Sequence, residues 1–201
     1  AFELEKVGNN FLFFNEYLCD IIVPKLKEVD TNFLFNNRSL TSFHAHKLEK
    51  VRHSFLNNNL KIEEVDLPSV ETIGAYFMYY NRNLKNINLP KVKKIGNEFL
   101  YSNRELKFLS LPSVIEIGSR FMFNNIKMKD INLPKVKKIC QGFLYSNKCI
   151  KKLKLDELIF MDADGNRNRL RTIYAPNLCV LDRRDLNKHL RVVDDINELY
   201  N

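Results

Sequence analysis

The stretch "INLPKVKKI" occurs twice in this chain, at Ile87–Ile95 and, letter for letter, at Ile131–Ile139. Each copy is followed at the same distance by "FLYSN", at Phe99–Asn103 and Phe143–Asn147. The two copies begin 44 residues apart. Self-similarity at a fixed period is the sequence signature of a repeat architecture, so these residues serve a scaffold in which one unit recurs.

The underlying period is half of that separation, 22 residues. Every proline falls at one position of this frame, and four of the six glycines fall at another. The phenylalanine column comprises Phe11, Phe33, Phe55, Phe77, Phe99, Phe121 and Phe143, and an asparagine follows each four residues later, at Asn15, Asn37, Asn59, Asn81, Asn103, Asn125 and Asn147. A frame that places every proline in one column describes nearly the whole chain.

One repeat reads L-x-x-I-x-L-P-x-V-x-x-I-G-x-x-F-L-x-x-N, most clearly at Leu84–Glu105. The alternation in L-x-x-I-x-L predicts a short strand with one buried side, and the proline ends its pairing. The following glycine is a candidate for positive φ. The segment "NEFLYSN" at Asn97–Asn103 predicts a helical or 3₁₀ turn that an asparagine closes in the left-handed region.

A single unit cannot bury its own apolar side, whereas stacked units form a continuous core. The sequence therefore predicts an α/β solenoid: right-handed coils of 22 residues, about eight in number, with a parallel sheet on the concave side and short helical or 3₁₀ turns on the convex side. We expect one domain over residues 1–201, with regular coils at about 4–158, an irregular coil at 159–181 and a C-terminal cap or partial coil at 182–201. The predicted core contains Val23, Leu67, Leu89, Leu111, Leu133 and Leu155 beside Phe77, Phe99 and Phe121.

Over residues 4–181 the pattern resembles the BspA-like leucine-rich repeats, which are marked by I-x-L-P and then I-G-x-x-A-F-x-x-C. Here Phe–Leu or Phe–Met stands in place of Ala–Phe, and asparagine in place of cysteine. The resemblance implies a surface or secreted protein that binds host or matrix partners. It implies an extracellular or cell-surface location, and neither an enzyme activity nor a cofactor.

Two departures from the repeat contain residue types that can bind metal ions. His44, His46 and His53 lie in one coil, but no carboxylate or cysteine is placed to complete a ligand set, so they are interpreted as variable surface residues. The stretch "DADGNRNR" begins like a calcium loop at Asp162, but its glycine comes early and its twelfth position is Ile173 instead of glutamate. We interpret it as a polar turn, and the sequence predicts no metal site.

Composition and motifs narrow the function. The net charge of +8 and the pI of about 9.3 favour anionic partners, although a lysine-rich soluble surface has the same composition. No segment approaches the roughly 20 apolar residues of a membrane helix. The nucleophile elbow, the phosphate-binding loop, the zinc-protease motif and the dinucleotide fingerprint are all missing from the sequence. The chain is therefore predicted not to be an enzyme.

The candidate binding surface consists of the outward strand positions, the third and fifth of each frame, which run from acidic to basic along the chain. Phe108 is an outward aromatic in their middle, and the second frame position carries a basic residue in five consecutive coils. The predicted partner-binding residues are Phe108, Lys85, Lys107, Lys129, Lys151, Lys152, Lys154, Arg171 and Tyr174. The competing interpretation is a solvated surface with one stray apolar side chain.

Three functions remain open. The first is a non-catalytic module that binds a protein or an acidic glycan through its concave face. The second is a recognition or spacer arm of a larger multidomain effector, whose activity lies outside this chain. The third, a nucleic-acid binder, is least favoured because the lysine column lacks the interleaved aromatic residues that stack bases.

Overall fold

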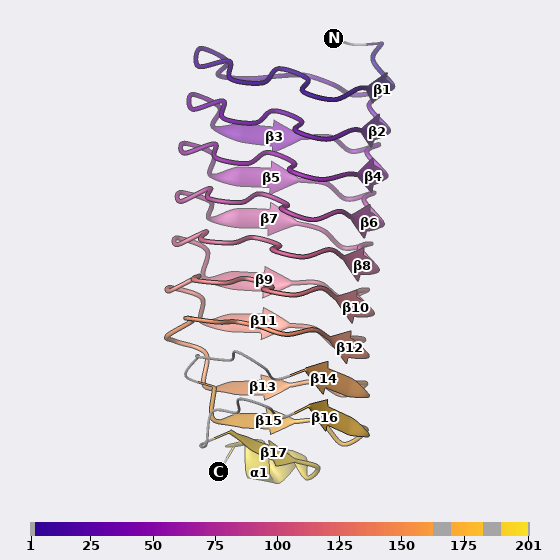
Figure 1. Cartoon of the computed structure of the whole chain (residues 1–201), viewed down its shortest axis with the longest axis vertical. Coiled ribbons are helices and arrows are strands. Elements are labelled where there is room, and N and C mark those ends of the chain that lie inside the picture. Colours follow the sequence, from indigo (N-terminus) through magenta and orange to yellow (C-terminus); the bar gives the residue numbers. More distant parts are fainter. Residues whose placement is uncertain (1–2, 163–169, 183–189, 201) are drawn as a thin grey trace.

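The structure is a computed structural model that describes residues 3–162, 170–182 and 190–200. Its coils stack into a nearly straight column with the two termini at opposite ends (Figure 1). Strand partners in neighbouring coils are parallel and lie 22 residues apart along the regular part of the chain, as between Glu116 and Lys94. The predicted parallel solenoid of about eight turns is therefore confirmed.

Most coils contribute two strands and the first described coil contributes one, so two columns of strands run along the stack. The first column is one continuous nine-stranded sheet of β1 (Lys6–Val7), β2 (Glu28–Val29), β4 (Lys50–Val51), β6 (Thr72–Ile73), β8 (Lys94–Ile95), β10 (Glu116–Ile117), β12 (Lys138–Ile139), β14 (Phe160–Asp162) and β16 (Val180–Asp182). The sequence predicted only the other column. Most strands of the nine-stranded sheet are two residues long, too short to show an alternation that predicts a strand.

The second column corresponds to L-x-x-I-x-L and is interrupted. It comprises β3 (Ser42–His44), β5 (Glu64–Asp66) and β7 (Asn86–Asn88); then β9 (Phe108–Ser110) and β11 (Asp130–Asn132); then β13 (Lys152–Lys154), β15 (Thr172–Tyr174) and β17 (Arg191–Val193). Among the described strands, the ladder is missing between β7 and β9 and between β11 and β13. Both interruptions follow a copy of the repeated "INLP" sequence.

The core lies between the two columns. Every leucine and valine predicted for it is buried, and so are Phe77, Phe99 and Phe121. The rings of the phenylalanine column stack on one another, with centroids 5.2 Å apart between Phe77 and Phe99 and 5.3 Å apart between Phe99 and Phe121. Identical residues meet in neighbouring coils, so each coil completes the apolar surface of the next.

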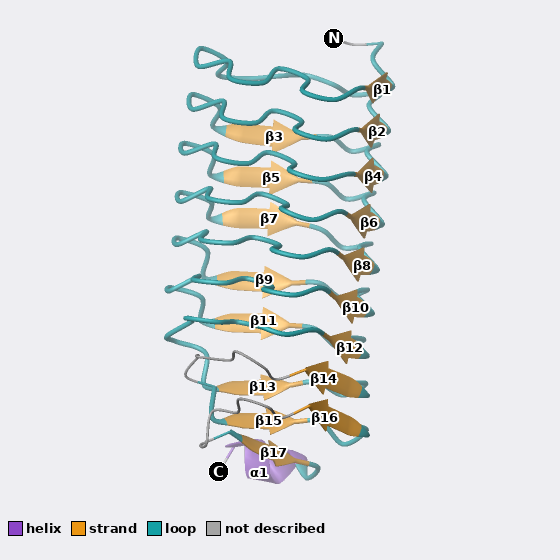
Figure 2. Cartoon of the chain, viewed as in Figure 1, coloured by secondary structure: helices purple, strands orange, loops and turns teal. Residues whose placement is uncertain are grey.

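The predicted helical turn before each asparagine is wrong. Figure 2 shows loops at these positions, and alternate residues there have positive φ, as at Glu98, Leu100 and Ser102. Their N–H groups donate to neighbouring coils on either side: Glu98 to Ser119, and Leu100 to Phe77. A helix needs those donors within its own chain segment, so coil-to-coil bonding excludes it.

The glycine column is required for close approach and not for positive φ. None of Gly74, Gly96 and Gly118 has positive φ. A Cβ placed on Gly96 would lie 2.6 Å from the carbonyl carbon of Gly74, and one on Gly118 equally close to that of Gly96. Consecutive coils therefore touch backbone to backbone at this column.

The asparagine column is buried from Asn37 to Asn147, and it bridges coils. The Nδ2 group of Asn81 donates to the Leu56 carbonyl of the preceding coil at 2.8 Å, and that of Asn103 donates to the Met78 carbonyl at 2.8 Å. The left-handed residues lie beside these asparagines and not at them. The column supplies hydrogen bonds just before each three-residue strand.

The short helix α1 (Ile196–Tyr200) packs on the outward side of the second column. It contacts β13, β15 and β17. Val193, which by register lies outward with Lys154 and Tyr174, is only 5% exposed. The helix therefore covers the C-terminal part of the surface on which the binding residues were predicted.

Candidate partner-binding face

The outward side of β3, β5, β7, β9, β11, β13 and β15 is hereafter the strand face. The middle residue of these strands points inward, while the flanking residues are at least partly exposed, as in β9 and β13. Phe108 stands at the centre of this face with 62% of its surface exposed. An exposed phenylalanine between polar neighbours has no role in the core.

Charges on the strand face form an acidic and a basic cluster along the stack, and the exposed Asp130 of β11 is an acidic residue within the basic half. Glu63, Glu64 and Asp66 form an acidic triad at β5, two coils before Phe108. Asp66 accepts a hydrogen bond from Asn88 Nδ2 at 2.8 Å and contacts His46 Nε2 at 3.0 Å. The N-terminal half of the face is therefore acidic around β5.

The basic triad, Lys151, Lys152 and Lys154, lies at β13, two coils after Phe108. Lys154 donates to Asp156 at 2.9 Å, and this hydrogen bond raises the pKa of its ammonium group. Lys151 and Lys152 are exposed and have no ion pair within the described residues. Among the described residues, no carboxylate competes with a partner for these two ammonium groups.

The predicted basic column is divided in the structure. Lys85 pairs with Glu63 of the preceding coil at 2.8 Å, so these two charges balance each other, and Glu64 and Asp66 give β5 its acidic character. Lys107 and Lys129 are exposed and form no ion pair in the part of the chain that the structure describes. Their charges therefore favour an anion only from β9 onward, in the half of the face that also holds the basic triad.

A groove of about 400 Å³ lies where the second column is first interrupted. Its walls are the outward side chains of β5 and β7 with Phe108 at one end, and it is lined by Glu64, Val65, Asp66, Lys85, Asn86, Ile87, Asn88 and Phe108. The repeat placed the outward strand positions correctly, but only Phe108 and Lys85 of this groove were predicted for binding. Glu64 and Asp66 were missed because the net positive charge favours basic residues as the binding groups.

At the C-terminal end of the face, the predicted residues are less accessible. Tyr174 is half-buried, whereas Arg171 is exposed. Since α1 contacts β15 and β17, it limits what can lie over Tyr174. The structure brings Phe108, Lys107 and Lys129 together on an open surface and places Tyr174 at its border.

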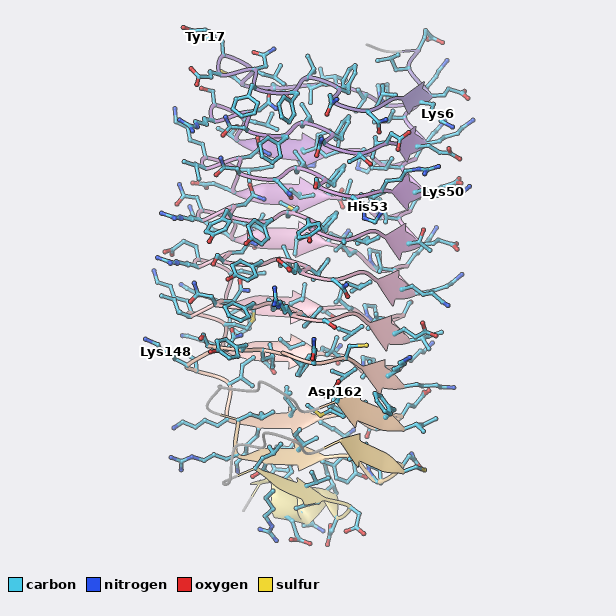
Figure 3. The ribbon with its side chains drawn as sticks, viewed as in Figure 1. Lys6, Tyr17, Lys50, His53, Lys148 and Asp162 are labelled. Atoms are coloured by element: carbon cyan, nitrogen blue, oxygen red, sulfur yellow. The ribbon has the colours of Figure 1, made fainter. Side chains whose placement is uncertain are left out.

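On the outward side of the nine-stranded sheet, acidic and basic side chains are mixed instead of separated. Its outward charges alternate from coil to coil, so that Glu28 accepts from Lys6 at 3.2 Å and from Lys50 at 3.2 Å. Figure 3 shows Lys6 and Lys50 on the outer side of this sheet. A second alternation pairs Lys93 with Glu71 at 3.0 Å. Paired charges leave little net potential for a partner.

A third surface carries an aromatic ladder of Tyr79, Tyr101, Phe123 and Tyr145 on the turns. Successive ring centroids are 4.5, 4.6 and 4.3 Å apart, and each pair is stacked. Burial raises the pKa of the Tyr79 hydroxyl. Because the ring faces cover one another, only ring edges point outward, and the ladder is no platform for stacking a sugar or a base.

Two histidines of the third coil contact polar groups of the protein itself. The ring of His46 contacts Asp66, and His53 Nδ1 accepts the Ala75 N–H at 3.0 Å. Each ring therefore serves a contact between coils. The predicted polar turn at 163–169 lies outside the described residues. No helix in the described ranges is long and apolar enough to cross a membrane.

Parallel coils of 22 residues, with aliphatic and phenylalanine columns inside, define the class of protein as a repeat solenoid. The family model described as BspA type Leucine rich repeat region (6 copies) matches residues 3–78 and 71–161. The chain therefore belongs to the BspA type leucine-rich repeat family. No curated protein and no solved structure matches the chain. Membership indicates a protein-interaction module, since solenoids present extended binding surfaces.

Proposed function

We propose that this chain is a non-catalytic interaction module of a surface or secreted protein, and that it binds a host or matrix protein or a glycan through the strand face. The observation that carries the proposal is Phe108, which is exposed at the centre of the face, beside the groove and next to Lys107. Binding energy at interfaces concentrates on a few central residues, often aromatic, within a polar surround. The predicted alternative, an arm of a larger effector, would use the same face for contact.

The test is a selection for ligands followed by substitution. A random peptide library displayed on phage, and an array of sulfated and unsulfated glycans, are each bound to the wild-type chain. Phe108→Ala should weaken the selected ligands at least tenfold at both low and high salt, because its contribution is apolar burial. The matched control is Ile115→Ala, which removes a 37% exposed apolar side chain outside the strand face.

The lysines of the strand face should contribute to binding through their charge, so their effect should depend on salt. The double variant Lys107→Glu with Lys129→Glu should weaken anionic ligands strongly at low salt and little at high salt, because exposed charges are screened within about 8–10 Å at physiological ionic strength. Lys91→Glu with Lys135→Glu changes the net charge equally in the turns that follow the prolines. Ligands that respond equally to both pairs, or that ignore Phe108→Ala, would contradict binding through the strand face.

A further inference from the structure

We infer that the strand face takes an extended peptide segment with separated charges: a basic end over the acidic triad, an apolar side chain beside Phe108 and an acidic end over the basic triad. This inference rests on the proposed function, because it names the partner class of the same face. It differs from the simple anionic partner that the net charge favours.

The charge arrangement supports a dipolar partner. Glu64 precedes Phe108 by two coils, and Lys152 follows it by two coils at the same frame position. The acidic and basic triads are thus equidistant from the exposed ring. A uniformly anionic segment long enough to reach both would place negative charge over Glu64 and Asp66, which costs affinity because like charges face each other.

The spacing suits a short segment. Neighbouring coils lie about 4.8 Å apart, so the two triads are separated by four steps, about 19 Å. An extended chain advances about 3.3 Å per residue, so roughly six residues span that distance. One central residue of the segment then falls near Phe108 and the groove lined by Asn86 and Asn88.

Helix α1 disfavours a second copy of this chain as the occupant. An antiparallel pair of strand faces centred on Phe108 would also match the triads, but it would set β15 and β17 against β3 and the first coil. Because α1 stands over β15 and β17 and contacts both, it would hold two such faces apart. A peptide limited to β5–β13 stays clear of β15 and β17 and meets α1 only at its end over β13.

The experiment uses synthetic peptides and the full chain, with binding followed by fluorescence anisotropy. The probe is Lys-Lys-Lys-Ser-Phe-Ser-Glu-Glu-Glu, and its reversed sequence serves as a second probe because either chain direction can align the charges. An isomer with alternating Lys and Glu has the same composition without charge separation. Uniformly acidic and uniformly basic versions complete the set. The separated-charge peptides should bind at least about tenfold more tightly than the other three, a difference of 1.4 kcal/mol.

Two charge-reversal variants of the chain should each lose the preference for separated charges and gain affinity for one of the uniformly charged peptides. Replacing Glu63, Glu64 and Asp66 by lysine should abolish the preference for separated charges and make the uniformly acidic peptide the best ligand. Replacing Lys151, Lys152 and Lys154 by glutamate should favour the uniformly basic peptide instead. A gained affinity shows that each variant is folded. The control, Lys47→Glu with Lys91→Glu and Lys135→Glu, changes the same number of charges outside the strand face and should leave the peptide ranking unchanged.

The outcomes separate this inference from the proposed function. If the alternating or the uniformly acidic peptide binds wild type as tightly as the separated-charge peptides, the inference is wrong, whereas ligands from the selection that depend on Phe108 would still support the face. Sedimentation of the peptide-free chain at rising concentration tests the other occupant. In a dimer of facing strand faces, each triad reversal alone should abolish self-association, and mixing the two variants should restore it. That result would overturn the inference of a peptide ligand in favour of a second copy of the chain.

Discussion

The two strand columns of this solenoid differ in continuity and in charge. The nine-stranded sheet runs unbroken from β1 to β16, and its outward lysines and glutamates pair between adjacent coils. The second column is broken twice, and it carries an acidic triad at β5 and a basic triad at β13. Both columns cover one core. One side of the repeat thus supplies cohesion between coils, and the other is the side for which we propose recognition.

The largest expected effect comes from a substitution in the core that both columns cover. Phe99 is completely buried in the ring stack, so Phe99→Ala should lower the free energy of unfolding by about 3–5 kcal/mol. Phe108→Ala removes the same side chain from an exposed position and should change stability by no more than about 0.5 kcal/mol. Denaturant unfolding of both variants measures the two changes in the free energy of unfolding. Equal losses would mean that Phe108 belongs to the fold and is no spare surface residue.

A smaller effect tests the asparagines that lead into the interrupted column. Asn81 Oδ1 accepts the Asn59 N–H at 2.7 Å, whereas Asn103 Oδ1 is buried without a hydrogen bond among the described residues. Both donate to a carbonyl of the preceding coil. Asn81→Leu should therefore cost about 2–3 kcal/mol and Asn103→Leu about 1–2 kcal/mol, through the backbone groups left unpaired. Unchanged melting temperatures would contradict a stabilising role for these asparagine hydrogen bonds. Equal losses of stability would contradict the larger effect expected for Asn81.

The interruptions should be visible in hydrogen exchange without any mutation. The Lys85 N–H donates to the Glu63 carbonyl at 2.9 Å and the Lys129 N–H to the Lys107 carbonyl at 2.8 Å. The corresponding N–H groups of Lys107 and Lys151 have no backbone partner in the described chain. We expect these two amides to exchange at least about tenfold faster than those of Lys85 and Lys129. Equal protection in native-state exchange would show that the column is continuous in solution.

The smallest effect concerns the paired charges. Hydrogen bonds from Lys50 and Lys6 hold the pKa of Glu28 below its ordinary value of 4.5. A carboxyl whose pKa is lower in the folded than in the unfolded state stabilises the fold above its ordinary pKa, and this contribution disappears as the pH falls through the folded value. The melting temperature should therefore decline slightly as the pH falls below 4.5, and less so in Glu28→Gln.

A glutamate of the strand face, Glu64, provides the control for this measurement of melting temperature against pH. Glu64 forms no ion pair among the described residues, so Glu64→Gln should leave the acid dependence of the wild type in place. High salt should reduce the contribution of Glu28, because exposed pairs are screened. An acid dependence that Glu28→Gln does not alter would indicate that the charge ladder of the nine-stranded sheet contributes nothing measurable.

The amino-acid sequence alone determined the solenoid, its period and its core. A repeat constrains every coil in the same way, so the columns of Leu89 and Phe99 predict burial without any knowledge of distant contacts. The outward position of Phe108 also followed from the period of two along a strand. The composition, however, favoured lysines over Glu64 as binding residues, because net charge says nothing about how charges are arranged on one face.

Only the tertiary structure decided how the coils bond to one another. The turn at Glu98–Ser102 looks like a helical turn by length, but its N–H groups find partners in adjacent coils, which local sequence does not show. The glycine column lacks a Cβ because Gly74, Gly96 and Gly118 stack backbone on backbone, a contact between residues 22 positions apart. The groove beside Phe108 and the cover that α1 forms over β15 likewise depend on which coils meet. Periodicity specifies what faces inward, whereas hydrogen bonds and contacts between coils specify the backbone and the open part of the proposed binding face.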